Sequence, residues 1–389
     1  MSAVKKWIVL LALLTAFPPL STNMYLPAMP SLARQWQEPF WMINLTLVLF
    51  FLVFSIFLLI YGPLSDRFGR KILLQTGISV YVAASFLCAF SQGVFSLIIF
   101  RMLQATGAAS AAALSLAITK DIFEDYHREK ILAYISMVVA LSPMLGPAIG
   151  GWALSIFSWN WIFVILGFMG ISALFGVSRM PETLAPELRT ESIELFKGYA
   201  ALVHNKRYIV LTCLTTFGTM PLFAFVAASS EIYIVGYGLS ERTYGYFFGF
   251  NALALMAGSF TCIRIGGQVM SRNILSIGFL GIAAGGLWLF LGNNDGPWDL
   301  ALPVFVMSFS LGLSRPPSHN LVLKQVLKGA GAASSLLMFA MMTTGAAAMW
   351  FISLNWDEVT SVLGIMGLSC ASFGLICWLL IQKFSAHPW

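Results

Sequence analysis

The sequence predicts an all-α membrane protein with two similar bundles of six helices. Of 389 residues, 59% are hydrophobic and only 10% are charged, whereas about 25% of the residues in soluble domains are charged. Apolar runs of about 20 residues recur from end to end, and each is long enough to cross a bilayer as a helix. One long polar stretch, residues 179–207, divides these runs into two sets of six.

Twelve membrane spans are expected. Helices satisfy their own backbone hydrogen bonds, as hydrocarbon requires, and the short alternating segments of a membrane β-barrel do not occur. The first span follows Lys5 and Lys6 but is too long for a signal peptide, so we expect it to be retained. The spans are placed near 7–31, 40–63, 72–90, 94–118, 130–153, 160–178, 208–235, 243–263, 273–292, 299–322, 331–353 and 359–381.

The polar stretch predicts the domain organisation. We expect an N-terminal six-helix bundle at 1–180, a linker at 181–207 and a C-terminal six-helix bundle at 208–389. Apolar residues between Glu187 and Leu202 recur near helical spacing, which predicts a short amphipathic helix at the membrane surface.

Basic residues predict the orientation in the membrane. With the N-terminus inside, all but four of the 22 Lys and Arg lie in cytoplasmic loops or at cytoplasmic helix ends. The exceptions are Arg34 and Arg242 outside, and Arg101 and Arg315 within spans. This excess on one side predicts that both termini are cytoplasmic. The net charge of +6 therefore reflects topology, and no nucleic-acid partner is expected.

Residue types that support catalysis or metal binding do not cluster. The five cysteines lie in apolar segments without paired spacing, which predicts small buried side chains. The four histidines are scattered, and no nucleophile elbow or phosphate loop occurs. We expect no enzyme activity, no catalytic residue, no cofactor and no metal site.

A charged loop after the second span carries the first specific motif. "YGPLSDRFGRK" resembles the signature G-x-x-x-D-R-x-G-R-K of the major facilitator superfamily. Gly62 is expected to permit close helix packing and Gly69 a tight turn. Asp66 is expected to pair with a helix N-terminus or an arginine, as part of a conformational latch. The matching positions are Gly62, Asp66, Arg67, Gly69, Arg70 and Lys71.

Two further motifs follow in the same half. "RMLQATGAA", beginning at Arg101, is similar to the family's R-x-x-Q-G-x-G pattern. An arginine inside a span is costly unless it faces a partner or water, so Arg101 is a functional candidate; the alternative is that it snorkels to the outer surface. "SPMLGPAIGGW" resembles the motif of the exporting, antiporter branch through Gly146, Pro147, Gly150 and Gly151.

The stretch "STNMYLPAMP", residues 21–30, narrows the resemblance. With the other motifs it resembles the Bcr/CflA branch of drug:proton antiporters over essentially the whole chain. The second half matches less well, and "GSFTCIRIGGQVMSRN" is a degenerate second copy of the loop signature. The resemblance implies a monomeric exporter of small organic molecules in the bacterial inner membrane. It also implies alternating access, with protons and membrane lipid as further partners.

Asn23 departs from the family pattern. The resemblance implies an acid at this position, thought to carry the coupling proton, and an amide cannot titrate. Glu231, the one acid clearly inside an expected span, is the substitute candidate; alternatively, it faces water at the outer rim. Coupling could also run through the substrate's own proton, the protein could be a facilitator that uses no proton, or Asn23 could be an engineered acid-to-amide change.

Polar residues in the spans suggest what is carried. The candidates for lining a substrate cavity are Tyr25, Asn44, Gln104, Asn251, Arg315, His319 and Asn320. Pro316 and Pro317 are expected to break the tenth span beside Arg315. Two arginines without a central acid favour an anionic substrate, such as a siderophore-type carboxylate, unless Arg315 snorkels to the cytoplasmic surface. A transport-incompetent membrane sensor is the alternative from another class.

Overall fold

The computed structural model describes residues 3–123, 125–185, 192–266, 268–293, 295–326 and 330–384, and the regular elements in these ranges are helices. Eleven of them are long and apolar enough to cross a membrane. The remaining expected span, 130–153, falls on α6 (Asp125–Leu154), nearly half of whose side chains lie outside the described residues.

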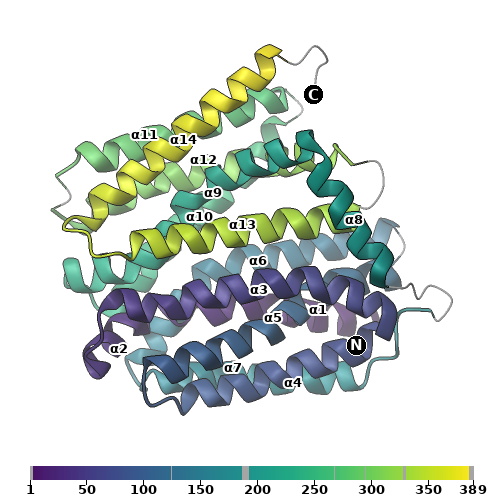
Figure 1. The fold of residues 1–389 in the computed structure, drawn as a ribbon. Helices are drawn as coiled ribbons and strands as arrows, with labels where there is room; N and C mark the ends of the chain where they lie inside the picture. Colours follow the sequence, from purple (N-terminus) through teal and green to yellow (C-terminus); the bar gives the residue numbers. More distant parts are fainter. Residues whose placement is uncertain are drawn as a thin grey trace. The chain divides into compact units, whose positions relative to one another are not determined.

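The backbone forms two compact units, Met1–Gly198 and Tyr199–Trp389, which differ in colour in Figure 1. The first contains α1 (Ala3–Asn23), the 3₁₀ turn η1 (Leu26–Ala28), α2 (Met29–Trp36), α3 (Phe40–Phe68), α4 (Arg70–Ala89), α5 (Val94–Ile122), α6 and α7 (Asn160–Ser178). The second contains α9 (Lys206–Ser230), the π-helical turn η3 (Glu231–Gly236), α10 (Glu241–Ile265), α11 (Ser271–Leu291), α12 (Pro297–Leu323), α13 (Ala330–Ile352) and α14 (Val359–Phe384).

Helix packing follows the same order in both units. In the first, α1 packs on α6, α3 and α4 pack on α5, and α4 packs on α7. In the second, α9 packs on α13, α10 and α11 pack on α12, and α11 packs on α14. The first to sixth spans of one unit thus correspond to those of the other. This repeated packing is the pseudo-symmetry that the two sets of six apolar runs predict.

The linker forms a helix, as expected, but not with the expected limits. α8 runs over Ser192–His204 (Figure 1), and the expected start at Glu187 lies outside the described residues. Asn205 caps the next helix, because its side chain accepts a hydrogen bond from the Tyr208 N–H at 3.2 Å. The chain therefore turns directly from α8 into α9.

Two prolines do not break the tenth span, contrary to the sequence expectation. α12 continues through Pro316 and Pro317. A proline leaves the carbonyl four residues earlier without its helical donor, and for Pro316 that carbonyl belongs to Gly312. The Ser259 hydroxyl of α10 donates to it at 3.1 Å. A neighbouring helix thus replaces the lost bond, which is how membrane helices tolerate proline.

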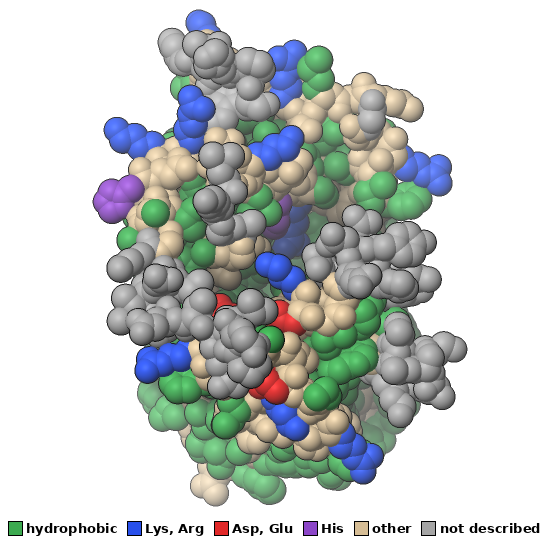
Figure 2. Space-filling view, turned by 90° about the vertical axis from the view of Figure 1, so that its right-hand side faces the viewer, with side chains coloured by type: hydrophobic (Ala, Val, Ile, Leu, Met, Phe, Trp, Pro, Cys, Tyr) green, Lys and Arg blue, Asp and Glu red, His purple; other side chains and the backbone are tan. Residues whose placement is uncertain are grey.

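Within each unit, basic side chains gather at one end of the helices. Figure 2 views the end at which α8 lies and shows several Lys and Arg side chains, with fewer acidic ones among them. The described basic residues at helix ends or in the following loops include Arg67, Lys71, Arg179, Lys206, Arg207, Arg272, Lys324 and Lys383. The membrane-facing sides are apolar, and large exposed hydrophobics recur along the spans.

Candidate functional site

The first span is interrupted at Asn23. Met24 still donates its N–H to the Leu20 carbonyl at 3.1 Å, but α1 ends there and the chain restarts as η1 and α2. Pro27 explains the position of the break, because its ring would clash with the carbonyl four residues earlier, that of Asn23. Carbonyls in the last turn of α1 are left without helical donors.

Two glycines of α6 make room for this break. A Cβ on Gly146 would lie 2.6 Å from the Cβ of Asn23, and a Cβ on Gly150 would collide with the Met24 carbonyl. Any larger residue would push the interrupted segment away from α6. The two glycines of the antiporter-like motif therefore form a seat for Asn23 and Met24.

Arg101 of α5 binds a carbonyl at the C-terminal end of α1. Its Nη1 donates to the Ser21 carbonyl at 2.9 Å and to Gln104 Oε1 at 2.6 Å. The carbonyl end of a helix carries partial negative charge, which favours a cation there. The side chain is completely buried, so the alternative that Arg101 snorkels to the surface is wrong.

Aromatic rings surround the same guanidinium. Its carbon atom lies 4.3 Å from the ring centre of Phe50, 5.2 Å from that of Tyr25 and 5.8 Å from that of Phe163. A cation over such faces gains about 0.5–2 kcal/mol at each, more where water is excluded. Arg101 Nε and Nη2 have no hydrogen-bond partner among the described residues. The cation is thus held by a helix end, an amide and π-faces, without a carboxylate.

Further hydrogen bonds tie this cage to α3 and α4. Gln104 Nε2 donates to Ser85 Oγ at 2.8 Å, and the hydroxyls of Ser21 and Tyr81 lie 2.7 Å apart. Thr46 Oγ1 donates to the Tyr25 hydroxyl at 3.1 Å. The sequence motifs indicate Arg101, Gln104 and Tyr25, but Ser21, Tyr81, Phe50 and Phe163 carry no signal that separates them from other span residues.

Asn23 uses its amide as a donor. Its Nδ2 donates to the Pro19 carbonyl at 2.6 Å, and the residue is buried. A protonated carboxylic acid could make the same bond, whereas an ionised carboxylate has no proton to donate. Asn23 therefore holds the end of α1 in the arrangement that a neutral acid would give.

The charged loop between α3 and α4 forms a second polar cluster. Arg70 makes ion pairs with Asp66 and with Asp121 of α5, and it also donates to the Ser65 hydroxyl. The expected pairing of Asp66 with an arginine is confirmed. Gly69 has φ 97°, a left-handed value that favours glycine, so the expected tight turn is present.

One expectation for this loop is wrong. A Cβ on Gly62 would meet no atom within 4 Å, so this glycine does not serve close helix packing in the described structure.

Glu182, which no motif singled out, completes the cluster. Its carboxylate accepts the N–H groups of Arg70 at 2.9 Å and Lys71 at 3.2 Å, at the start of α4, and those of Thr183 and Leu184. Partial burial would raise the pKa of Glu182, but the four N–H donors outweigh it and lower the pKa below its ordinary value. The segment after α7 is thereby fastened to the N-terminus of α4.

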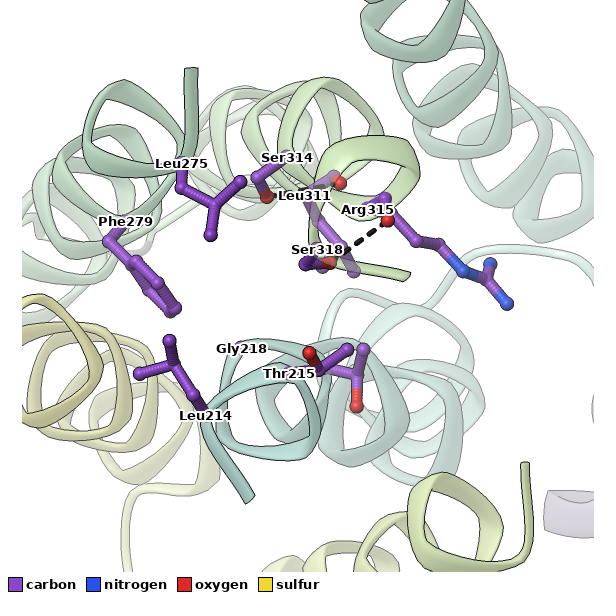
Figure 3. A pocket seen from close by; sticks show the side chains of 10 residues that line it. Leu214, Thr215, Gly218, Leu275, Phe279, Leu311, Ser314, Arg315 and Ser318 are labelled. Carbon is purple, nitrogen blue, oxygen red and sulfur yellow. Dashed lines mark hydrogen bonds between the residues drawn. The ribbon is translucent and has the colours of Figure 1, made fainter. Parts of the chain in front are cut away.

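In the second unit, a pocket lies between α9, α11 and α12. The space between its lining residues, about 310 Å³, includes open solvent, so the enclosed part is much smaller. Figure 3 shows Leu214, Leu275 and Phe279 at one end and Thr215, Ser314 and Ser318 nearer to Arg315. The Arg315 guanidinium extends beyond α12, away from Phe279 (Figure 3). The pocket is apolar at one end and polar at the other.

Arg315 and His319 lie one helical turn apart without acidic partners. No ion pair or hydrogen bond of the Arg315 guanidinium is found in the described part of the chain. The His319 Nε2 atom is buried there without a hydrogen-bond partner. Both side chains are only partly exposed. This pair can serve an anionic group, because it offers donors and positive charge that the described protein groups leave unused.

The other sequence candidates are divided between buried and exposed positions. Asn44 and Asn251 are buried in α3 and α10, whereas Asn320 is exposed on α12. Glu231 is half-buried in η3. The geometry therefore gathers Tyr25 and Gln104 around Arg101, and leaves Asn320 outside any described cluster.

The sequence is similar to known transporters. A model of the Major Facilitator Superfamily matches residues 11–352. An uncharacterised transporter of that superfamily, YdgK of Bacillus subtilis, is 28% identical over 382 residues, covering 94% of each chain. A bicyclomycin resistance protein homolog of Haemophilus influenzae is 28% identical over 392 residues, covering 97% of this chain and 96% of the relative. The multidrug transporter MdfA of Edwardsiella piscicida is 30% identical over 223 residues, 56% of this chain and 53% of the relative.

Solved structures show the same fold at low identity. A peptide transporter of the POT type matches with a TM-score of 0.77 and 13% identity over 98% of this chain and 96% of that chain. The xylose transporter XylE from E. coli matches with a TM-score of 0.74 and 14% identity over 99% and 98%. With the matching family model and the repeated helix packing, these similarities identify the chain as a multi-pass membrane transporter of the major facilitator superfamily.

Proposed function

We propose that this protein is a secondary active exporter of small organic molecules, working by alternating access and coupled to protons. The relatives named for bicyclomycin resistance and multidrug transport support efflux. The observation that carries the proposal is the break in α1, which is seated on Gly146 and Gly150 and bound by the buried Arg101. Such a break is where a membrane helix can change its path at small cost.

Arg101 connects this break to the rest of the first bundle. Through the Ser21 carbonyl it holds α1, and through Gln104 and Ser85 it reaches α4. A movement of the C-terminal end of α1 would break these hydrogen bonds of Arg101 and allow others to form. Substrate binding at α1 can therefore alter the packing of α4 and α5. An exporter needs such a connection between its binding site and its helices.

We further propose a bacterial inner-membrane location with both termini in the cytoplasm. The basic residues at the end viewed in Figure 2 support this orientation, since cytoplasmic loops are enriched in Lys and Arg. The loop cluster around Arg70 and Glu182 would then lie on the cytoplasmic side, where it holds α4, α5 and the segment after α7 together.

An anionic substrate is the second candidate, favoured by Arg315 and His319. Neither has an acidic partner among the described residues, and a guanidinium inside a membrane span is costly unless a counter-charge or water reaches it. A carboxylate-bearing compound of the metallophore type would supply that counter-charge.

Flux in proteoliposomes tests the proposal. Bicyclomycin, a lipophilic cationic dye and a tricarboxylate would be compared, each with and without an imposed pH gradient. Accumulation of at least one compound that rises with the gradient is expected. If none crosses faster than in empty liposomes, the exporter proposal is wrong. Substrate flux that does not depend on the pH gradient would instead identify a facilitator.

Replacing Asn23 by Asp tests whether this position affects coupling. An ionised carboxylate at position 23 would lose the bond to the Pro19 carbonyl. We expect the pH dependence of transport by the Asn23→Asp protein to differ from that of the Asn23 protein, because a second titratable group is then present. Identical pH profiles would show that the position does not take part in coupling.

A further inference from the structure

The two bundles carry a similar short sequence where their first spans become irregular. Residues 21–25, Ser-Thr-Asn-Met-Tyr, end α1, and residues 229–233, Ser-Ser-Glu-Ile-Tyr, end α9. α1 and α9 are counterparts, because α1 packs on α6 as α9 packs on α13. In this register Asn23 corresponds to Glu231. An amide that cannot titrate is matched by a carboxylic acid that can.

Hydrogen bonds of the two segments support this register. The hydroxyls of Ser21 and Tyr81 lie 2.7 Å apart, and those of Ser229 and Tyr244 lie 2.9 Å apart. Both pairs are buried, but Tyr81 belongs to α4, a third span, whereas Tyr244 belongs to α10, a second span. Each serine thus fixes the last turn of a first span to a tyrosine of the same bundle, although the two tyrosines lie on different spans.

The tyrosines four residues later correspond as well. Tyr25 and Tyr233 are both fully buried. The Tyr25 hydroxyl accepts from Thr46 of α3, and the Tyr233 hydroxyl lies against Asn251 of α10. Because α3 and α10 are the second spans of their bundles, each tyrosine points to the equivalent helix.

The backbone is irregular at both positions, but in different ways. α1 stops at Asn23 and resumes as a 3₁₀ turn, whereas α9 passes at Glu231 into the π-helical turn η3. π-helical turns are rare and occur frequently at functional sites. The hydrogen-bond pattern of α9 therefore changes at Glu231, and the Ser230 hydroxyl beside it is buried without a hydrogen-bond partner in the described part of the structure.

No charged group among the described residues pairs with Glu231. The carboxylate makes no ion pair or hydrogen bond with any described residue, and it is half-buried. α13 carries no titratable side chain, and Lys383 of α14 lies at the opposite end from Glu231. The other titratable or charged groups of α9, of η3 and of the helices that pack on either are Lys206, Arg207, Tyr208, Cys213, Tyr233, Tyr237, Glu241, Arg242, Tyr244, Tyr246, Cys262, Arg264, Asp299, Arg315, His319, Cys370 and Cys377.

We propose that Glu231 is the proton-binding group of the transport cycle, occupying in the second bundle the place that Asn23 holds in the first. The carboxylate takes one proton from the side of higher proton concentration and returns to the ionised form when it releases that proton on the other side. Asn23 meanwhile remains a permanent hydrogen-bond donor to the Pro19 carbonyl. The inference rests on the proposed exporter function, since it assigns the coupling site within it.

Flux measurements with Glu231→Gln test the assignment. Proteoliposomes would be loaded with bicyclomycin, and both gradient-driven accumulation and substrate counterflow would be measured. Because a coupling site links proton and substrate movement, we expect accumulation to fall about tenfold more than counterflow. The control is Glu358→Gln, an exposed glutamate between α13 and α14, which should change neither. Unchanged gradient-driven accumulation in Glu231→Gln would refute the assignment.

Two additional measurements separate this inference from the exporter proposal. Difference infrared spectroscopy of the purified protein should show a carboxylic-acid carbonyl band that titrates and that Glu231→Gln lacks; a band that persists in the variant overturns the assignment even if no substrate has been found. In the double variant Asn23→Asp/Glu231→Gln, the acid is returned to the first bundle. Partial recovery of gradient-driven accumulation would support the correspondence of the two positions, and no recovery would contradict it.

Discussion

The two bundles repeat one packing scheme but surround their intramembrane arginines differently. Arg101 of the first bundle is held by a helix end, an amide and three aromatic rings. Arg315 of the second bundle has no hydrogen bond or ion pair from its guanidinium among the described residues. A desolvated guanidinium needs partners. In the first bundle, protein groups are the partners of the guanidinium. In the second bundle, the described residues provide none, so its partners would be water or a ligand.

The loops between the second and third spans differ in the same way. In the first bundle, Arg70 joins Asp66 and Asp121, and Glu182 covers the start of α4. In the second, the described residues on either side of position 267 contain no ion pair. The difference between the two loops is therefore one of ion pairs. The described ion pairs all belong to the charged loop of the first bundle.

Replacing the two arginines should give the largest difference in stability between a variant of the first bundle and a variant of the second. Arg101→Ala leaves a cavity among aromatic rings and removes the donor to the Ser21 carbonyl and Gln104, so we expect a loss of about 3 kcal/mol in the free energy of unfolding. Arg315→Ala should lose less than about 1 kcal/mol, because no described partner is stranded. Unfolding in detergent checks both values. Equal losses would mean that Arg315 also has a structural role.

Glycine substitutions in the fifth spans, α6 and α13, should give a smaller difference in stability between the two bundles. A Cβ on Gly150 meets the Met24 carbonyl, part of the backbone, whereas one on Gly345 of α13 meets the Phe223 side chain at its Cγ, which can move only if that side chain turns about its Cα–Cβ bond. We expect Gly150→Ala to cost about 1–3 kcal/mol and Gly345→Ala clearly less. Thermal unfolding of the two variants, with Gly62→Ala as a control in open space, makes the comparison. A milder effect at Gly150 would contradict the proposed seat.

Neutralising Glu182 should have a pH-dependent effect. Since the pKa of Glu182 is lowered in the folded protein, its contribution is present above the pKa of the unfolded chain and is lost as pH falls through the folded pKa. We expect Glu182→Gln to lose about 0.5–1 kcal/mol near pH 7, and we expect this loss to shrink as the pH falls through the folded pKa of Glu182. Unfolding measured across this range tests the direction. Glu358→Gln, in an exposed loop of the second bundle, should show little dependence.

The smallest effect on stability is expected for Arg315→Gln, which should still alter selectivity. Stability should change by less than about 0.5 kcal/mol. If Arg315 provides positive charge to a substrate, transport of a tricarboxylate should fall more than transport of a cationic dye. Parallel flux assays with the two compounds measure the ratio. An unchanged ratio would leave Arg315 without a role in charge selection.

The sequence by itself determined the class of fold, the order of the spans and the positions of the family motifs. These follow from local properties: apolar runs of membrane length, a polar linker, and glycine where a turn needs a left-handed φ, as at Gly69. It also indicated Arg101 and Gln104 as functional candidates. It could not indicate Phe50 or Phe163, because aromatic residues are common throughout the spans.

Only the tertiary structure decided which groups meet. Pro316 and Pro317 suggested a broken helix, but Ser259 of a neighbouring helix supplies the missing hydrogen bond and α12 continues. Glu182 is more than 100 residues from Arg70, yet it covers the start of α4. Partners that arrive from distant segments leave no local pattern in the chain. The sequence could thus locate a buried cation, while the fold determined that a helix end and aromatic faces hold it.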